Sequence, residues 1–128
     1  MACRNEKGEP VIRPLKKAVD MSAIPFPYED LDDFEHKIVY YESSRGCPFS
    51  CSYCLSSLDK SVRFRSMELV KRELDFFLER RVPQVKFVDR TFNCSRKHTM
   101  EIWRHITEHD NGVTLSLIHI SEPTRLDV

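Results

Sequence analysis

Residues 36–54 have the sequence HKIVYYESSRGCPFSCSYC, a short apolar run followed by three closely spaced cysteines. Residues 36–42 are rich in β-branched and aromatic side chains and end at a polar turn, which predicts a buried strand. The thiolates of Cys47, Cys51 and Cys54 follow on one short loop. Such a set can bind three irons of a four-iron, four-sulfur cluster and leave the fourth iron open. The stretch therefore predicts a strand with an iron–sulfur loop at its carboxyl end.

Two helices are predicted beyond this loop. Ser66 is a suitable N-cap, and apolar side chains recur at helical spacing over residues 67–78, before Pro83 stops the helix. A second helix is expected to begin near Ser95, with apolar side chains along one side and Asn-Gly at residues 111–112 as its C-terminal stop.

Two further strands complete the predicted order. Residues 84–89 form the second strand, and residues 113–114 open a third. Alternation of strands and helices is typical of parallel βα units, whose chemistry lies on the loops at the carboxyl ends of the strands. We therefore predict an α/β fold in which the cysteine loop and residues 89–93 lie on the same face.

The composition excludes several classes of protein. The 128 residues include 20 basic and 20 acidic side chains, so no net charge draws the chain toward nucleic acid or a membrane. No apolar run is long enough to span a bilayer, and the polar N-terminus does not resemble a secretory signal. We expect a cytoplasmic protein whose clustered cysteines bind metal. Cys3 and Cys94 lie apart from the cluster, and no role is predicted for them.

A structural zinc site is the main alternative for the cysteine loop. Zinc needs a fourth ligand, commonly cysteine or histidine. The candidates for this ligand are Cys94, His36, His98, His105 and His109. None of them has the usual short spacing from a second ligand pair, and the cysteine loop belongs to a βα unit. A chance grouping of reduced cysteines is the other alternative. The triplet at the end of a strand favours the cluster over both.

His105 and His109 are spaced i,i+4 and therefore share one helical face. Two histidines with this spacing can bind a metal when a further ligand is present. The glutamate that directly follows the first histidine in an HExxH-type motif is absent, because residue 106 is isoleucine, and no third ligand is identified nearby in the sequence. A solvated polar face is therefore the favoured interpretation of this pair.

The cysteine spacing, the aromatic Tyr53 directly before the last cysteine, and the preceding strand resemble the radical S-adenosylmethionine (radical SAM) superfamily. The resemblance implies an enzyme in which Cys47, Cys51 and Cys54 bind a [4Fe-4S] cluster and the open iron binds SAM. Reductive cleavage of SAM would give a 5′-deoxyadenosyl radical that acts on an unknown substrate, with flavodoxin or ferredoxin as electron donor. Tyr53 corresponds to an aromatic residue near the adenine. No residue is predicted as catalytic.

Two further cofactor-binding residues are inferred from the same resemblance. Many family members place a Gly-Gly-Glu-like run after the second strand to hold the SAM amino group, and this sequence has none. Asp89 is the nearest acidic substitute, although an exposed or salt-bridged aspartate is an equal alternative. Arg45 could face the carboxylate of SAM or the charge of the cluster, or it could be a solvated loop arginine.

The resemblance covers residues 24–114 and is strongest to radical SAM proteins with an N-terminal B12-binding domain. It implies that residues 36–114 form the first two to three βα units of a partial (βα)6 TIM-like barrel. The later strands that would bind substrate are not part of the sequence, and any cobalamin would be bound by an upstream domain. A non-catalytic iron–sulfur module for electron transfer or sensing is the alternative function.

The two ends of the chain are expected to lie outside this core. Residues 1–35 contain four of the seven prolines and are predicted to be a linker. Residues 115–125, LSLIHISEPTR, match the in-frame translation of a transposase-type sequencing adapter, and residues 126–128 fit a barcode read in the same frame. We expect residues 115–128 to be an artefact, with a genuine strand as the alternative. Such a fragment, with exposed sheet edges, is expected to be unstable and inactive.

Overall fold

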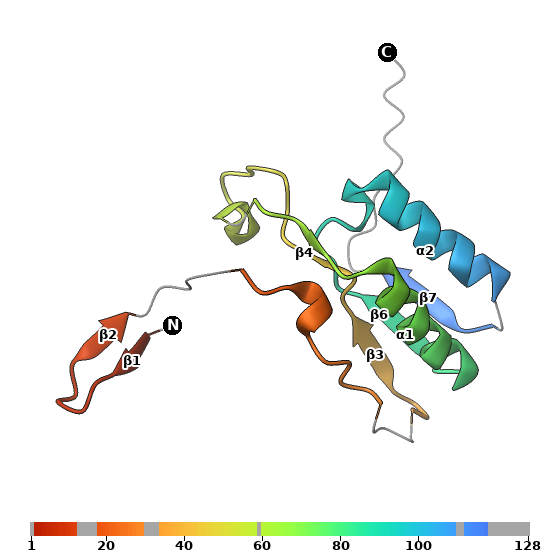
Figure 1. The fold of residues 1–128 in the computed structure, drawn as a ribbon, viewed down its shortest axis with the longest axis horizontal. Coiled ribbons are helices and arrows are strands. Elements are labelled where there is room, and N and C mark those ends of the chain that lie inside the picture. The colour runs from red at the N-terminus through yellow and green to blue at the C-terminus, as the bar shows by residue number, and fades with distance from the viewer. Residues whose placement is uncertain (1, 13–17, 30–33, 59, 110–111, 118–128) are drawn as a thin grey trace, which may run out of the picture.

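The computed structural model describes residues 2–12, 18–29, 34–58, 60–109 and 112–117 as a mixed α/β structure (Figure 1). Its strands are β1 (Ala2–Arg4), β2 (Pro10–Ile12), β3 (Ile38–Tyr41), β4 (Ser44–Arg45), β5 (Arg63–Phe64), β6 (Gln84–Phe87) and β7 (Thr114–Leu117). The two α-helices are α1 (Met67–Glu79) and α2 (Arg96–Glu108), and short 3-10 helices lie at Met21–Ala23, Leu55–Leu58 and Phe92–Cys94. None of the described helices is both long and apolar enough to cross a bilayer.

The central sheet is parallel and has the order β3-β6-β7. Ile38 lies opposite Gln84, which in turn lies opposite Thr114. Helix α1 connects the first pair of strands and α2 the second, and the two helices contact each other against the sheet (Figure 1). The predicted order of strands and helices is therefore confirmed. Strand β7 extends into the segment expected to be an artefact as far as Leu117, and residues 118–128 lie outside the described residues.

Only one face of this sheet is covered by helices. Val39, Tyr41, Val85 and Phe87 alternate along β3 and β6, are at most 5 % exposed, and pack against apolar side chains of α1 and α2. Residues on the opposite face of β3 remain open, and Tyr40 is 53 % exposed. The prediction of a buried first strand is therefore correct for one face and wrong for the other, because no described element packs there.

Both ends of α1 are capped. The Ser66 side chain accepts a hydrogen bond from the Leu69 amide at 3.4 Å, as the N-cap prediction requires. At the C-terminus, Arg81 has a φ of 49°, and the amides of Arg81 and Val82 bond back to the carbonyls of Leu78 and Phe77. This is a Schellman motif with arginine in the left-handed position that glycine usually occupies. It turns Val82 into the core before Pro83, so the helix ends earlier than the proline alone predicts.

The predicted linker is partly structured. Strands β1 and β2 form an antiparallel hairpin, whose turn is held by the Asn5 side chain. Further along, Phe26 packs edge-to-face against Phe76 and Phe77 of α1, with ring centroids 5.3 and 5.4 Å apart. The Tyr28 hydroxyl donates to the carbonyl of Tyr40 at 2.7 Å. The segment before the sheet therefore covers α1 with aromatic rings and is fastened to β3.

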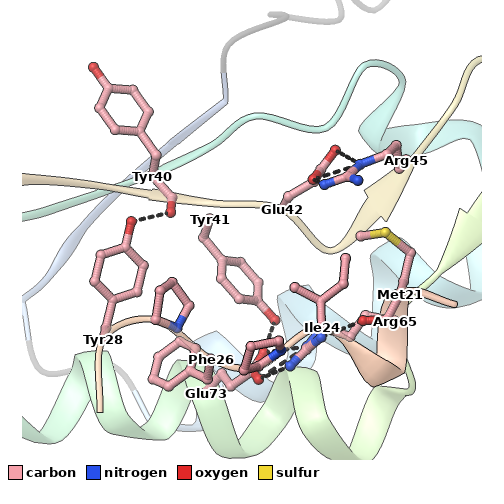
Figure 2. A pocket seen from close by; sticks show the side chains of 12 residues that line it. Met21, Ile24, Phe26, Tyr28, Tyr40, Tyr41, Glu42, Arg45, Arg65 and Glu73 are labelled. Carbon is pink, nitrogen blue, oxygen red and sulfur yellow. Dashed lines mark hydrogen bonds and ion pairs between the residues drawn. The ribbon is translucent and has the colours of Figure 1, made fainter. Parts of the chain in front are cut away.

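A buried ion pair joins the entry of α1 to the sheet (Figure 2). Arg65 and Glu73 have side chains that are 7 % and 1 % exposed, and the Arg65 Nε donates to the Glu73 carboxylate at 2.8 Å. Tyr41 of β3 donates its hydroxyl to the same carboxylate at 2.8 Å, and Arg65 also donates to the carbonyl of Met21. Burial, reinforced by the Glu73 charge, raises the pKa of Tyr41. The carboxylate thus links β3, α1 and the segment before the sheet.

We expect Glu73→Ala to be strongly destabilising, because it leaves the Arg65 guanidinium buried without its counter-charge. Removing one partner of a buried pair costs about 3–5 kcal/mol. The free energy of unfolding in urea measures the effect. Glu79→Ala, at an exposed position of the same helix, should change it by less than about 0.5 kcal/mol. Equal effects of the two substitutions would contradict this account.

Candidate functional site

The cysteine loop occupies residues 46–62 and is closed at its base by a short antiparallel pair of strands. Ser44 of β4 lies opposite Phe64 of β5, and Arg45 lies opposite Arg63. The Arg65 amide continues the ladder by donating to the carbonyl of Ser43 at 2.9 Å. Both ends of the loop are therefore fixed directly after β3, at the carboxyl edge of the parallel sheet.

At Gly46 the two arms of the loop approach each other closely. It has a φ of 104°, and a Cβ atom built on it would lie 2.2 Å from the backbone oxygen of Ser61. Only glycine combines this backbone angle with so close an approach. The turn directly before the first cysteine therefore requires glycine.

All five cysteines are free thiols, and the three in the loop differ in exposure. Cys51 is exposed, whereas Cys47 and Cys54 are half-buried. The Thr91 hydroxyl, from the loop that follows β6, donates to the Cys47 sulfur at 3.2 Å. The amide of Cys54 donates to the carbonyl of Cys51 at 3.2 Å, so these two ligands are held in one tight turn.

The separation of these sulfurs bears on the kind of metal they could hold. A single zinc ion draws its thiolates to about 2.3 Å from the metal, and so to within about 4 Å of one another. Across the described part of the chain, no three ligand atoms that include these sulfurs lie within 4.8 Å of one another. In this conformation the three sulfurs are therefore not gathered closely enough to bind one zinc ion together.

Asp89 joins the ends of β3 and β6. Its carboxylate is 1 % exposed and accepts three hydrogen bonds, from the Ser43 amide at 3.1 Å, the Ser43 hydroxyl at 2.7 Å and the Ser44 hydroxyl at 2.6 Å. Asp89 is buried rather than exposed, and it forms no ion pair with any other residue that the structure describes. Ser43 and Ser44 lead directly into Gly46 and Cys47, so Asp89 sets where the cysteine loop begins.

His98, near the start of α2, completes this buried network. Its Nε2 lies 3.2 Å from the Ser43 hydroxyl, and its ring packs against Phe64 with centroids 4.7 Å apart. Because Ser43 donates its only hydroxyl proton to Asp89, the histidine must be the donor in this pair. Burial lowers the pKa of His98, which favours the neutral ring. His98 therefore acts as a neutral hydrogen-bond donor within the network.

The remaining two predicted cofactor residues, Arg45 and Tyr53, differ in their surroundings. Arg45 turns toward Glu42 and forms a bidentate ion pair with it, which raises the pKa of the guanidinium (Figure 2). Arg45 and Glu42 line a pocket of about 170 Å³ that is otherwise largely aromatic and apolar. Tyr53 is 91 % exposed.

Three residues of this site were not singled out by sequence: Ser43, Ser44 and Thr91. The two serines were predicted only as part of a polar turn, Thr91 has no local pattern, and His98 was considered only as a ligand of the alternative zinc site. Each acts through a partner more than 40 residues away in the chain. Only the expectation that the carboxyl ends of the first and second predicted strands lie side by side could have indicated these residues.

We expect Gly46→Ala to disrupt the base of the cysteine loop, because the added methyl group collides with the Ser61 backbone. The left-handed angle and the collision together should destabilise the chain by at least about 3 kcal/mol in urea unfolding. Gly8→Ala is the matched control, since Gly8 also has positive φ but a Cβ atom added there would meet no other atom within 4 Å. That change should cost about 1 kcal/mol. A similar cost at both positions would show that the approach to Ser61 is not restrictive.

Two curated proteins are similar to the chain. An uncharacterized methyltransferase of Pyrococcus horikoshii is 34 % identical over 108 residues, which is 77 % of this chain and 22 % of that protein. The hopanoid C-2 methylase of Rhodopseudomonas palustris is 29 % identical over 109 residues, covering 77 % of this chain and 21 % of the methylase. The chain thus spans about a fifth of the length of these relatives. No protein-family model and no solved structure matches it.

Proposed function

We propose that the chain carries the iron–sulfur loop of a radical SAM methyltransferase. The observation that carries this proposal is the set of three free thiols on one loop, closed at its base, at the carboxyl edge of a parallel sheet. Catalytic groups of βα folds gather at this edge. Similarity to a methyltransferase and to a methylase supports methyl transfer as the reaction class.

Cys47, Cys51 and Cys54 would hold three irons of a [4Fe-4S] cluster, with SAM on the fourth. One electron delivered through such a cluster cleaves the sulfonium bond of SAM into methionine and a 5′-deoxyadenosyl radical. Thr91 would keep its hydroxyl bond to Cys47 and stabilise the charge on that sulfur. The half-buried Cys47 and Cys54 anchor the loop, and the exposed Cys51 leaves a path for the irons to enter.

The other predicted residues have distinct parts in this proposal. Tyr53 is free to turn over the adenine beside Cys54, because nothing in the described chain covers it. Arg45 can bind the carboxylate of SAM only by exchanging its bonds to Glu42. Asp89 supports the loop through Ser43 and Ser44; because it is buried, a direct contact with the SAM amino group would require the side chains that cover it to move.

The surroundings of the site agree with part of a larger barrel. Both helices cover one face of the sheet, as in a (βα)6 barrel, and the face that would line the interior is open at Ile38 and Tyr40. We propose that further βα units close this face and bind the substrate, and that an upstream domain binds cobalamin. The protein would act in the cytoplasm with a flavodoxin or ferredoxin as electron donor.

Cys51→Ala is expected to abolish cluster binding, because two thiolates do not hold a four-iron cluster. The chain is reconstituted without oxygen from iron and sulfide, and bound iron, acid-labile sulfide and visible absorbance are measured. Cys3→Ala is the control, since Cys3 lies in the β1–β2 hairpin, and it should leave all three unchanged. Retention of the cluster in Cys51→Ala would refute the ligand assignment.

One observation favours a second candidate, a non-catalytic iron–sulfur module. Cys94 is half-buried near the site, and burial, with smaller contributions from Asp89 and Cys47, raises the pKa of its thiol. A fourth cysteine ligand would complete the coordination of the cluster and exclude SAM. We prefer an open fourth iron, because the similarity to a methyltransferase and to a methylase favours an enzyme.

Cys94→Ala separates the two functions. If the fourth iron binds SAM, the variant keeps its cluster, and the full-length protein produces 5′-deoxyadenosine from SAM under a strong reductant. Product analysis by chromatography measures this outcome. Loss of the cluster in Cys94→Ala, together with no 5′-deoxyadenosine from the unaltered protein, would instead establish the electron-transfer or sensing module.

A further inference from the structure

A second group of metal-ligating side chains lies between α1 and α2. Its members are Asp75 of α1, His105 in the last turns of α2, and His109 directly after α2. One ligand atom from each lies within 4.8 Å of the other two. In βα units the helices end near the amino ends of the following strands, so this group lies at the opposite end of the sheet from the cysteine loop. The group is therefore independent of the proposed iron–sulfur site.

The contacts within the group are short and specific. The Nε2 atom of His105 lies 2.6 Å from the Oδ1 atom of Asp75, and the two imidazole rings are 4.4 Å apart at an angle of 36°. The side chains of His105 and Asp75 are 11 % and 39 % exposed, and His109 is exposed. The three ligands thus form a partly sheltered set that remains open to solvent on one side.

Hydrogen bonding prepares His109 for a metal. Its Nδ1 lies 2.8 Å from the carbonyl oxygen of His105, which can only accept, so Nδ1 carries the proton. The lone pair then remains on Nε2, which is the tautomer that metal-binding histidines adopt when a carbonyl fixes the other nitrogen. This bond orients the exposed ring and reduces the entropy that binding would otherwise cost.

We propose that Asp75, His105 and His109 bind a divalent cation of the zinc class and thereby fasten α1 to α2. Two imidazoles and one carboxylate are a common set of protein ligands for zinc, with water in the fourth position. The cation would replace the hydrogen bond between Nε2 of His105 and Asp75, and His105 would bind it as the neutral tautomer that carries its proton on Nδ1. A solvated face was the favoured interpretation from the sequence because the third ligand, Asp75, lies 30 residues before His105.

The test uses the whole chain with its five cysteines changed to serine, so that no thiol competes for the metal. Zn²⁺ affinity is measured by competition with a chromophoric chelator, and Co²⁺ absorption reports the ligand geometry. We expect one Zn²⁺ per chain and a rise in melting temperature when it binds. His109→Asn and Asp75→Asn, each introduced singly, should weaken binding at least about tenfold.

His36→Asn is the matched control, since it removes the imidazole of a histidine whose side chain is 92 % exposed and lies outside the group. It should leave Zn²⁺ affinity unchanged, and circular dichroism confirms that each variant folds. No binding, or binding that both site variants leave unchanged, would overturn the proposal. Loss with His109→Asn but not with Asp75→Asn would also overturn it, because a histidine pair alone would then hold the ion.

Discussion

The carboxylate of Asp89 ties together the carboxyl ends of two parallel strands, and the position of the cysteine loop depends on it. A buried charge is tolerated only when hydrogen bonds replace its water, and Ser43 and Ser44 supply three. Those serines lead directly into the turn at Gly46. The hydrogen bonds to this carboxylate therefore compensate its burial, hold the ends of the two strands together and fix the position of the residues that precede the first cysteine.

The one-sided sheet explains the distribution of exposed apolar side chains. Helices α1 and α2 bury one face, and Glu73, Arg65 and Tyr41 join that layer to the segment before it. The other face and the cysteine loop leave Tyr40 and Tyr53 in solvent. In a barrel assembled from further units, these surfaces would be interior; the chain matches only about a fifth of the length of each relative.

Much of the fold could be predicted because its signals are local. Helical spacing and the caps Ser66 and Ser95 identified both helices, and alternation of elements identified a parallel sheet. Three features were missed because they are not local or break a preference. The hairpin before residue 13 has no alternation of apolar and polar side chains, and Arg81 occupies a position typical of glycine. One face of β3 is exposed because no described element packs against it.

The sequence by itself determined the features on which the proposed cluster site rests: three cysteines within eight residues, an aromatic neighbour, and a glycine directly before the first cysteine. These depend on residue type and short spacing, which no packing can alter. Only the tertiary structure decided which side chains that are distant in the sequence come into contact. Thr91 contacts Cys47, 44 residues away, Asp89 contacts Ser43, 46 residues away, and Asp75 contacts His105, 30 residues away. Such pairs arise from the parallel register and from the packing of α1 on α2, both of which depend on the whole chain.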